Sequence, residues 1–156
     1  RVVTGVTSSL NDAKVTLIGV RDKPGIAAKI FISLSNNNIN VDMIVQNISE
    51  SAKTTDITFT IPKDDLVEAQ KIMEDIKKDV PYENIIVDSN IAKISIIGVG
   101  MRSNAGVAAN MFNVLSENAI NIDVISTSEI KISILINDEH AEKAVNMLHK
   151  FFGLDN

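Results

Sequence analysis

Cysteine is absent from this 156-residue sequence, as is tryptophan. Without cysteine the chain has no disulfide framework, no thiolate nucleophile and no cysteine-ligated zinc site. The histidines, His140 and His149, lie on one expected helix without carboxylates at the spacing of metal ligands. We therefore expect no metal site and no covalent cysteine chemistry, and the lack of cysteine fits a cytoplasmic protein.

An excess of positive charge is also missing, because 15 Lys and Arg stand against 20 Asp and Glu, for a net charge of −5. A nucleic-acid surface needs a basic stripe, so we expect no nucleic-acid partner. No apolar run approaches the roughly 18 residues of a spanning helix, and the start of the chain lacks a secretory signal, so no membrane partner is expected. The sequence also lacks an initiator Met, as expected of a fragment or a processed form.

Motifs of catalysis are missing as well. The sequence contains no Gly-x-Ser-x-Gly nucleophile turn and no Gly-x4-Gly-Lys phosphate loop. Gly98 and Gly100 form an isolated pair, too short for a dinucleotide fingerprint. The paired carboxylates at 64–65 and 138–139 each fall where a helix is expected to start, and the helix dipole accounts for them. We therefore expect no catalytic residue and no cofactor.

What the sequence does contain is an internal duplication, with a two-residue insertion before Gly106 in the second copy. Such self-similarity indicates that the chain contains two copies of one structural unit. Four pairs of segments match in order: Ala13–Val20 with Ala92–Val99, Gly25–Ala28 with Gly106–Ala109, Asn37–Ile44 with Asn118–Ile125, and Ile57–Ile61 with Ile132–Ile136.

Each copy has the periodicities of strand, helix, strand, strand and helix. In the first copy these cover a strand ending at Val20, a helix at about 25–36, strands at 39–48 and 57–61, and a helix capped by Asp64. Pro81 ends that helix, and a fourth strand follows at 85–87. Two helices on one face of a four-stranded antiparallel sheet make a ferredoxin-like βαββαβ arrangement, so the fold class is α+β.

The second copy lacks a fourth strand of its own. Its helices are expected at about 105–118 and 138–152, and the sequence given stops soon after the second of them. A spare β-prone segment at 2–8 precedes the first copy, and we expect it to fill the vacant place in the second sheet. The first domain, 13–90, is then nested within the second, 1–12 plus 91–156.

The turn after the first strand is the best candidate for a binding site. Pro24 and Gly25 stand where the helix begins, and the first helical amides have no partner inside the helix, so they can hold a carboxylate. Asp22 beside them can accept a bond from an ammonium group. One turn therefore offers a partner for the ammonium group and a partner for the carboxylate of a free amino acid. A Pro-Gly turn is, however, more often only a connection between a strand and a helix than a binding site.

The second strand of each copy begins with an Asn-x-Asp motif. An extended segment's free amide and carbonyl groups can clasp the backbone-like part of an amino acid. The alternative is that Asp42 and Asp123 only keep the start of the strand soluble. The residues alone favour neither interpretation.

Together these motifs resemble the ACT domain, and their combination is similar to the tandem regulatory region of the aspartate kinase family. The residues that carry the resemblance extend over nearly the whole chain: 3–6, 22–27, 45–47, 54–59, 98–101 and, as the most specific segment, 125–130. The kinase domain of that family, with its Lys-Phe-Gly-Gly-Thr motif, is absent from the sequence. The chain therefore resembles a separately made regulatory subunit or a truncated form.

The resemblance implies feedback regulation by threonine, lysine or both. Asp22 would hold the effector's ammonium group, the amides of Gly25, Ile26 and Ala27 would approach its carboxylate, and Gln46 would bond its polar side chain or ammonium. Other residues would contribute across an ACT–ACT interface by clasping the main-chain part or by binding a lysine side chain: Asn121, Ile122, Asp123, Ser128 and Glu129.

Thr58 and Ser49 match positions at or near the same interface. The second copy departs from the family's turn, because Arg102-Ser103-Asn104-Ala105 replaces the acid and the proline, which puts an equivalent second site in doubt. The expected partners are a catalytic aspartate kinase domain or subunit and a second copy of the chain, paired through exposed sheet edges. An effector that favours one packing of the ACT units would shift the catalytic part towards an inactive arrangement.

Two alternatives remain open. The chain could be an ACT-type sensor of another amino-acid biosynthetic enzyme, although such a sensor is not expected to carry the Ser-Thr-Ser-Glu-Ile segment at 126–130. It could also be an enzyme on a ferredoxin-like scaffold, which would need a titrating cluster that the sequence does not display.

Overall fold

The computed structural model describes residues 2–48, 53–101 and 104–154, and the chain divides into two compact units. We call Asn11–Ser89 the inner domain and Arg1–Leu10 with Asn90–Asn156 the outer domain, because the first is inserted in the sequence of the second. The inner domain agrees with one sequence repeat and the outer domain with the other. The predicted boundaries, 13–90 and 1–12 plus 91–156, stay a prediction.

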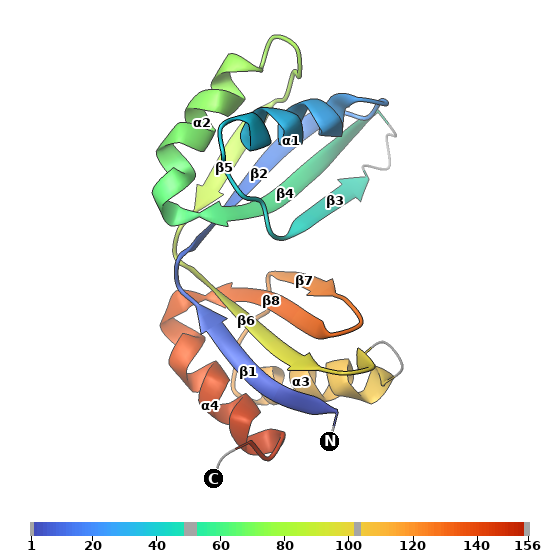
Figure 1. Ribbon diagram of the computed structural model, residues 1–156, viewed down its shortest axis with the longest axis vertical. Helices are drawn as coiled ribbons and strands as arrows, with labels where there is room; N and C mark the ends of the chain where they lie inside the picture. Colours follow the sequence, from blue (N-terminus) through green and yellow to red (C-terminus); the bar gives the residue numbers. More distant parts are fainter. Residues whose placement is uncertain (1, 49–52, 102–103, 155–156) are drawn as a thin grey trace. The chain divides into compact units, whose positions relative to one another are not determined.

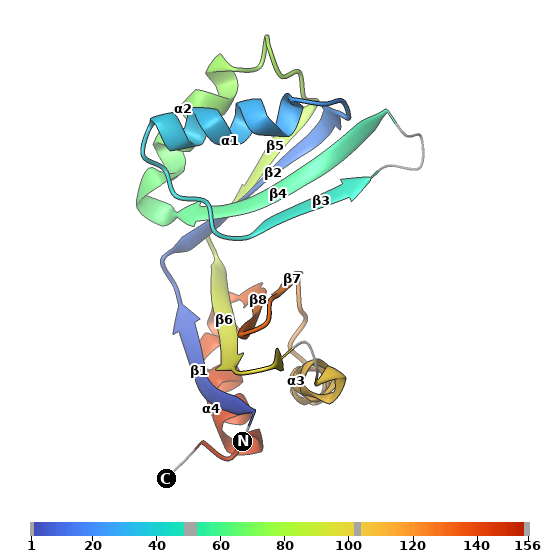
Figure 2. The ribbon, with the colours of Figure 1, turned by 45° about the vertical axis from the view of Figure 1, so that its right-hand side comes forward.

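The inner domain is a four-stranded antiparallel sheet with the strand order β3-β4-β2-β5, and Figures 1 and 2 show both helices on one of its faces. Its elements in chain order are β2 (Asp12–Arg21), α1 (Ile26–Asn36), β3 (Ile44–Ile48), β4 (Thr54–Pro62), the 3-10 turn η1 (Lys63–Asp65), α2 (Leu66–Asp75) and β5 (Asn84–Asp88). This is the ferredoxin-like topology expected from the sequence.

The outer domain is built in the same way, with the strand order β1-β6-β8-β7. Its elements are β1 (Val3–Ser9), β6 (Ile91–Gly98), α3 (Ala105–Glu117), β7 (Val124–Thr127), β8 (Lys131–Asn137), the 3-10 turn η3 (Asp138–His140) and α4 (Ala141–Phe151). β1 pairs antiparallel with β6, as β5 does with β2. The nested arrangement is therefore confirmed, because a segment ahead of the first repeat completes the sheet of the second.

Each domain has its own hydrophobic core between the sheet and its helices. In the inner domain, alternate residues of β2 and β4 face α1 and α2, with Leu17 and Phe59 fully buried against Leu34 and Met73. In the outer domain Ile94, on β6, is equally buried within an isoleucine-rich core. Full burial of one such side chain contributes about 1.5–3 kcal/mol. In each repeat, apolar residues at every second position of the strands therefore give a sheet with one buried face.

The prediction that Asp64 caps α2 was wrong. Residues Lys63–Asp65 form a 3-10 turn that leads into α2, so Asp64 lies inside a helical turn rather than in the extended conformation that a cap needs. The extended residue here is Pro62, with φ −59° and ψ 139°, and proline has no side-chain acceptor. The outer domain has Asn137 at the equivalent place, and its side chain accepts from the amide of Glu139 (3.0 Å).

The second strand of the first repeat is shorter than expected, since β3 begins at Ile44 rather than near 39. Two residues before β3 share one partner on β4: the amide of Asp42 donates to the carbonyl of Thr60, whereas the amide of Met43 donates to the Thr60 hydroxyl. A hydroxyl that takes the place of a backbone acceptor interrupts the regular ladder. The segment from 39 to 43 is therefore attached to the sheet without being a strand.

Tyr82 attaches the segment between α2 and β5 to the core. The ring is buried, its hydroxyl donates to the carbonyl of Met73 (3.1 Å), and the Nζ atom of Lys77 lies 4.9 Å from the ring centroid. Burial, with the Glu74 carboxylate as a smaller cause, raises the pKa of Tyr82 above its usual 10.0. The neutral phenol is thus the form that the folded state favours.

We predict that Tyr82→Phe lowers the free energy of unfolding by about 1 kcal/mol at pH 8, the typical net value of one hydrogen bond. Because the pKa is higher in the folded state, the wild type should also lose stability as the pH rises through 10, when the unfolded chain ionises first. Urea unfolding of both proteins at pH 8 and pH 10.5 measures both effects.

In this comparison Tyr82→Phe is the control for every other group that titrates in the alkaline range. The difference in stability between the two proteins should shrink as the pH rises. A difference that stays constant between the two pH values would contradict the proposed effect of burial on Tyr82.

Candidate functional site

The first candidate site is the turn between β2 and α1 of the inner domain. β2 ends at Arg21, yet the amide of Asp22 still donates to the carbonyl of Lys53 (2.9 Å), the residue that precedes β4. The amide of Lys23 then donates back to the Arg21 carbonyl (3.2 Å). The turn is thus tied to the sheet as far as Asp22, whose side chain is exposed.

Gly25 directs the chain from this turn into α1. It has φ 90° and ψ −14°, a conformation that side-chain-bearing residues rarely adopt, and its carbonyl accepts from the amide of Lys29 (3.1 Å). No side chain in the described part of the chain caps the start of α1. Ile26 is buried in the core and fixes the start of the helix, whereas Ala27 is exposed. The first amides of α1 and the positive end of its dipole therefore lie next to Asp22 in the chain.

Gln46 lies on the edge strand β3, opposite Ile57 of β4. Directly opposed residues of an antiparallel pair point to the same face of the sheet. Ile57 is in the core, so Gln46 is on the helix-covered face, at its edge, and exposed. This is the face that α1 covers (Figures 1 and 2).

The hydroxyl of Thr58 points the other way. It lies 3.0 Å from the hydroxyl of Thr16, in a pair on the helix-free face of the sheet. The side chain of Thr58 is therefore on the opposite face from Gln46. Ser49, the other residue matched to the effector interface, lies outside the described residues.

Asn121, Ile122 and Asp123 form the extended segment that leads from α3 to β7 in the outer domain. Asn121 and Ile122 line a hollow of about 410 Å³ beside the end of α3, whose other lining residues are Phe112, Ser116, Ala119 and Ile120. Ile122 packs on the core with its inner side, and the amide of Asp123 donates to the carbonyl of Leu135 (2.9 Å). The segment is held on the sheet, with Asn121 exposed.

Ser128 and Glu129 lie in the turn between β7 and β8. The Ser128 amide donates to the Lys131 carbonyl (2.8 Å), and the Ser128 hydroxyl accepts from the Lys131 amide (3.2 Å). The carbonyl of Glu129 accepts from the amide of Met101 (2.9 Å), which belongs to the turn between β6 and α3. These bonds join the two turns at one end of the outer sheet.

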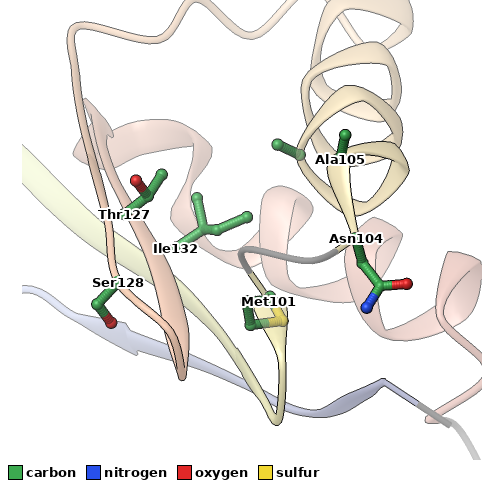
Figure 3. A pocket seen from close by; sticks show the side chains of 7 residues that line it. Met101, Asn104, Ala105, Thr127, Ser128 and Ile132 are labelled. Atoms are coloured by element: carbon green, nitrogen blue, oxygen red, sulfur yellow. The ribbon is translucent and has the colours of Figure 1, made fainter.

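A second hollow, of about 210 Å³, lies where these two turns meet, and Figure 3 shows its side chains between the start of α3 and the β7–β8 strands. Its lining residues are Met101, Asn104, Ala105, Ala108, Thr127, Ser128 and Ile132. By the sequence repeat, this is the counterpart of the turn at Asp22. Most of these residues were missed at the sequence level, although the duplication could have located them.

The structure groups the candidate residues by turn rather than in one place. Asp22, Gly25, Ile26 and Ala27 share the β2–α1 turn. In the outer domain the 121–123 segment and the 128–129 turn lie at opposite ends of β7, an extended strand with a rise of about 3.3 Å per residue. One small ligand bound to a single outer domain therefore does not reach both ends.

Other kinds of site are not found in the described part of the chain. The residues described contain no group of three or more His, Cys, Asp or Glu placed to hold a metal ion. None of their helices combines the length and the apolar character that a bilayer crossing requires.

Comparison with protein families matches a model described as "ACT domain" at residues 15–75 and again at 94–152. The first match runs from β2 to α2 and the second from β6 to α4, and together they include the turns discussed above. The chain therefore belongs to the ACT-domain family. Its two ACT domains match the regulatory ACT domains of aspartate kinases, as the next comparisons show.

The regulatory subunit of aspartate kinase from Thermus thermophilus, solved in a ligand-free form, has a TM-score of 0.90 and 40% identity, covering 96% of this chain and 98% of that one. A structure of aspartokinase alpha and beta subunits has a TM-score of 0.89 and 42% identity, covering 97% and 99% of the two chains. Aspartate kinase of Pseudomonas fluorescens is 46% identical over 154 residues, which are 99% of this chain and 37% of the relative. The chain thus spans little more than a third of that relative's length.

We predict that Gly25→Ala lowers the free energy of unfolding by about 1–2 kcal/mol, because a left-handed conformation costs that much for a residue with a Cβ atom. The space around Gly25 is open, with nothing within 4 Å of an added Cβ, so the conformation alone sets this cost. Thermal or urea unfolding of the two proteins measures it.

Gly25→Asn is the matched control, because asparagine tolerates the left-handed region better than alanine does. It should recover part of the lost stability. Equal losses for the two variants, or no loss for either, would contradict the conformation assigned to this turn.

Proposed function

We propose that this chain is a non-catalytic, amino-acid-sensing regulatory region of an aspartate kinase. It binds threonine, lysine or both at ACT–ACT interfaces and so mediates feedback inhibition of aspartate-family biosynthesis. The observation that carries the proposal is the β2–α1 turn, where an exposed carboxylate stands three residues before Gly25, at which a helix without a side-chain cap begins. This pairing of charges matches the ammonium and carboxylate groups that all free amino acids share.

At that turn, Asp22 receives the ammonium group, and the amides of Gly25, Ile26 and Ala27 receive the carboxylate. The helix dipole adds to the second contact, because an anion at a helix N-terminus is stabilised by about 0.3–1 kcal/mol. Gln46, on the helix-covered face at the sheet edge, bonds the polar end of the effector side chain. Selection among amino acids then depends on the side-chain contact rather than on the two end groups.

The rest of the site comes from a second ACT unit across an interface. There Asn121 and Ile122 bond the main-chain part of the effector, while Asp123, Ser128 and Glu129 serve a lysine side chain. Because Asp123 directly precedes β7 whereas Ser128 and Glu129 follow it, Asp123 serves a lysine side chain at one end of this strand, and Ser128 and Glu129 serve one at the other end. The proposal therefore includes more than one place for an effector.

A homodimer supplies the interface in this proposal. β3 and β7 are edge strands, and each exposes an isoleucine at an equivalent position of the repeat, Ile44 at 52% and Ile125 at 45%. An exposed edge strand offers unpaired backbone groups to another chain, and an apolar side chain on it favours burial. If β3 of one copy pairs with β7 of the other, the β2–α1 turn of one chain would lie beside the β7 edge of its partner.

The catalytic partner is a kinase domain or subunit. The curated relatives that match are named aspartate kinases, and this chain corresponds to 37% of their length. Effector binding that favours one packing of the ACT units shifts the linked catalytic part towards an inactive arrangement. A coupling of about 1–3 kcal/mol gives roughly 5–150-fold inhibition.

We predict that titration calorimetry detects binding of L-threonine, L-lysine or both to the chain, and that Asp22→Ala raises Kd about 10- to 100-fold. The expected loss is that of one hydrogen bond to a charged group, about 1.5–3 kcal/mol. L-Isoleucine, which has the same end groups but no polar side-chain atom, should bind more weakly than the preferred effector.

Asp64→Ala is the control, because this carboxylate is also exposed in the inner domain and has no role in the proposal. It should bind like the wild type. Binding that survives in Asp22→Ala would remove the turn from the site. The absence of binding heat with all of these amino acids would favour a sensor of another ligand.

We predict that Ile125→Lys raises the dimer dissociation constant at least about tenfold, because it buries an unpaired charge at the proposed edge. Sedimentation equilibrium of the wild type and the variant measures this change.

Val67→Lys is the matched control, since Val67 is 77% exposed on α2 and belongs to neither β3 nor β7. It should leave the dimer unchanged. A wild-type chain that stays monomeric at high concentration, or equal weakening by both variants, would contradict pairing through the sheet edges.

A further inference from the structure

β2 contains one extra residue just before the candidate turn. Leu17 lies opposite Ile57 on β4, but the next pair is Val20 with Thr55, so Ile18 and Gly19 together face Asp56. Two residues against one define a β-bulge, a feature that bends a strand and often re-aims the residues that follow. Gly19 has φ 71°, which suits glycine.

The bulge changes which β2 residues point into the core. From Ala13 to Leu17 every second residue is buried, but the next buried residue is Val20. A slip of one residue exchanges the two faces of a strand. With the bulge, Val20 points into the core, and the strand keeps this register up to Asp22, whose amide donates to the carbonyl of Lys53. Without the extra residue, Arg21 instead of Asp22 would fall on the same face of the strand as the core residues.

The peptide between Ile18 and Gly19 is held from both sides. Its carbonyl accepts from the amide of Glu83 (2.8 Å), on the side of β5. Its N–H, on Gly19, donates to the Oδ1 atom of Asp56 (3.0 Å). The side chain of Asp56 thus supplies the acceptor at the point where the bulge interrupts the backbone ladder, and a bond to a carboxylate is stronger than one to a neutral oxygen.

In the outer domain, the position that corresponds to Gly19 and Asp56 is built differently. Gly98 and Lys131 are the counterparts of Gly19 and Asp56 in the repeat. The amide of Gly98 donates to a backbone oxygen, the carbonyl of Ile130 (2.8 Å), and the described pairing of β6 with β8 runs without a register shift. In the outer domain the register shift at this level lies on β1, between Val3 and Gly5 and opposite Gly98 and Ile97 of β6. The copy that carries the Asp-Lys-Pro-Gly turn therefore has the extra residue on the strand that leads into the turn, with a carboxylate as its acceptor, whereas the described pairing of β6 with β8 has neither.

We propose that Asp56 is a positioning residue for the amino-acid site. Its carboxylate fixes the Ile18–Gly19 bulge, and the bulge sets the register that presents Asp22 and the start of α1 to the ligand. Asp56 itself does not touch the ligand. This inference rests on the proposed function of the β2–α1 turn and adds to it the residue that keeps the turn in place.

The test compares Asp56→Ala with Asp56→Asn in the 156-residue chain, titrated with L-threonine and with L-lysine at a temperature where every variant is folded. A solved Thermus regulatory subunit of matching extent is a precedent for using the chain by itself. The amide oxygen of asparagine can still accept from the Gly19 amide. We expect Asp56→Ala to raise Kd at least about tenfold, and Asp56→Asn to stay within about threefold of the wild type.

A second measurement reports on the bulge directly. Hydrogen exchange of the Gly19 amide, followed by NMR, should be slow in the wild type and in Asp56→Asn and fast in Asp56→Ala. Asp64→Ala should change neither Kd nor this exchange rate. If Asp56→Ala does not fold, Asp56→Thr replaces it with the same expectation, because threonine favours strands but its hydroxyl is one bond shorter than the carboxylate.

The outcomes separate the two proposals. Loss of affinity in Asp56→Ala with rescue in Asp56→Asn supports the positioning role. Wild-type affinity in Asp56→Ala, together with lost affinity in Asp22→Ala, would overturn the role of Asp56 and leave the effector site standing. Equal loss in Asp56→Ala and Asp56→Asn would also overturn it. A wild-type chain that binds neither amino acid would overturn the effector site and with it this role.

Discussion

The period of two along β2 is the constraint on which the inner domain depends. Side chains on one face of this central strand must meet α1 and α2, and those on the other face must not. The strand obeys the rule as far as Leu17, adds one residue, and obeys it again from Val20. Burial of apolar side chains thus fixes the strand on both sides of the bulge. Because the polar turn directly follows this strand, the packing of the core also determines where the turn lies.

The two repeats share this plan and differ where a function is proposed. Both have the same strand order, the same helix-covered face and a pair of hydroxyls at equivalent places on the other face, Thr16 with Thr58 and Ser95 with Ser133. Their first turns differ, because one has an acid beside a helix start and the other has a hollow bordered by hydroxyl and amide groups. The two copies therefore share their packing and differ in the turns that follow their first strands.

Much of this architecture could be predicted from the sequence, because it depends on burial periodicity that both copies display. The duplication even indicated that a strand from the start of the chain would complete the second sheet, as β1 does. The two errors have different causes. Asp42 and Met43 share Thr60 as their partner on β4, so the regular ladder of β3 begins only at Ile44. A helical turn already begins at Lys63, directly after Pro62, so Asp64 lies inside that turn. The burial pattern marks neither, because the first depends on a contact between strands and the second on the residue at which a helical turn starts.

The β2–α1 turn was identified at the sequence level from its residue types, but its supports were not, since Asp56 is 37 residues from Gly19 in the chain. A crystal structure of the chain soaked with the amino acid that it binds most tightly tests the central claim directly. We expect the ammonium group within about 3 Å of the Asp22 carboxylate and the ligand carboxylate at the first amides of α1. An amino acid bound elsewhere, with the turn empty, would contradict the account.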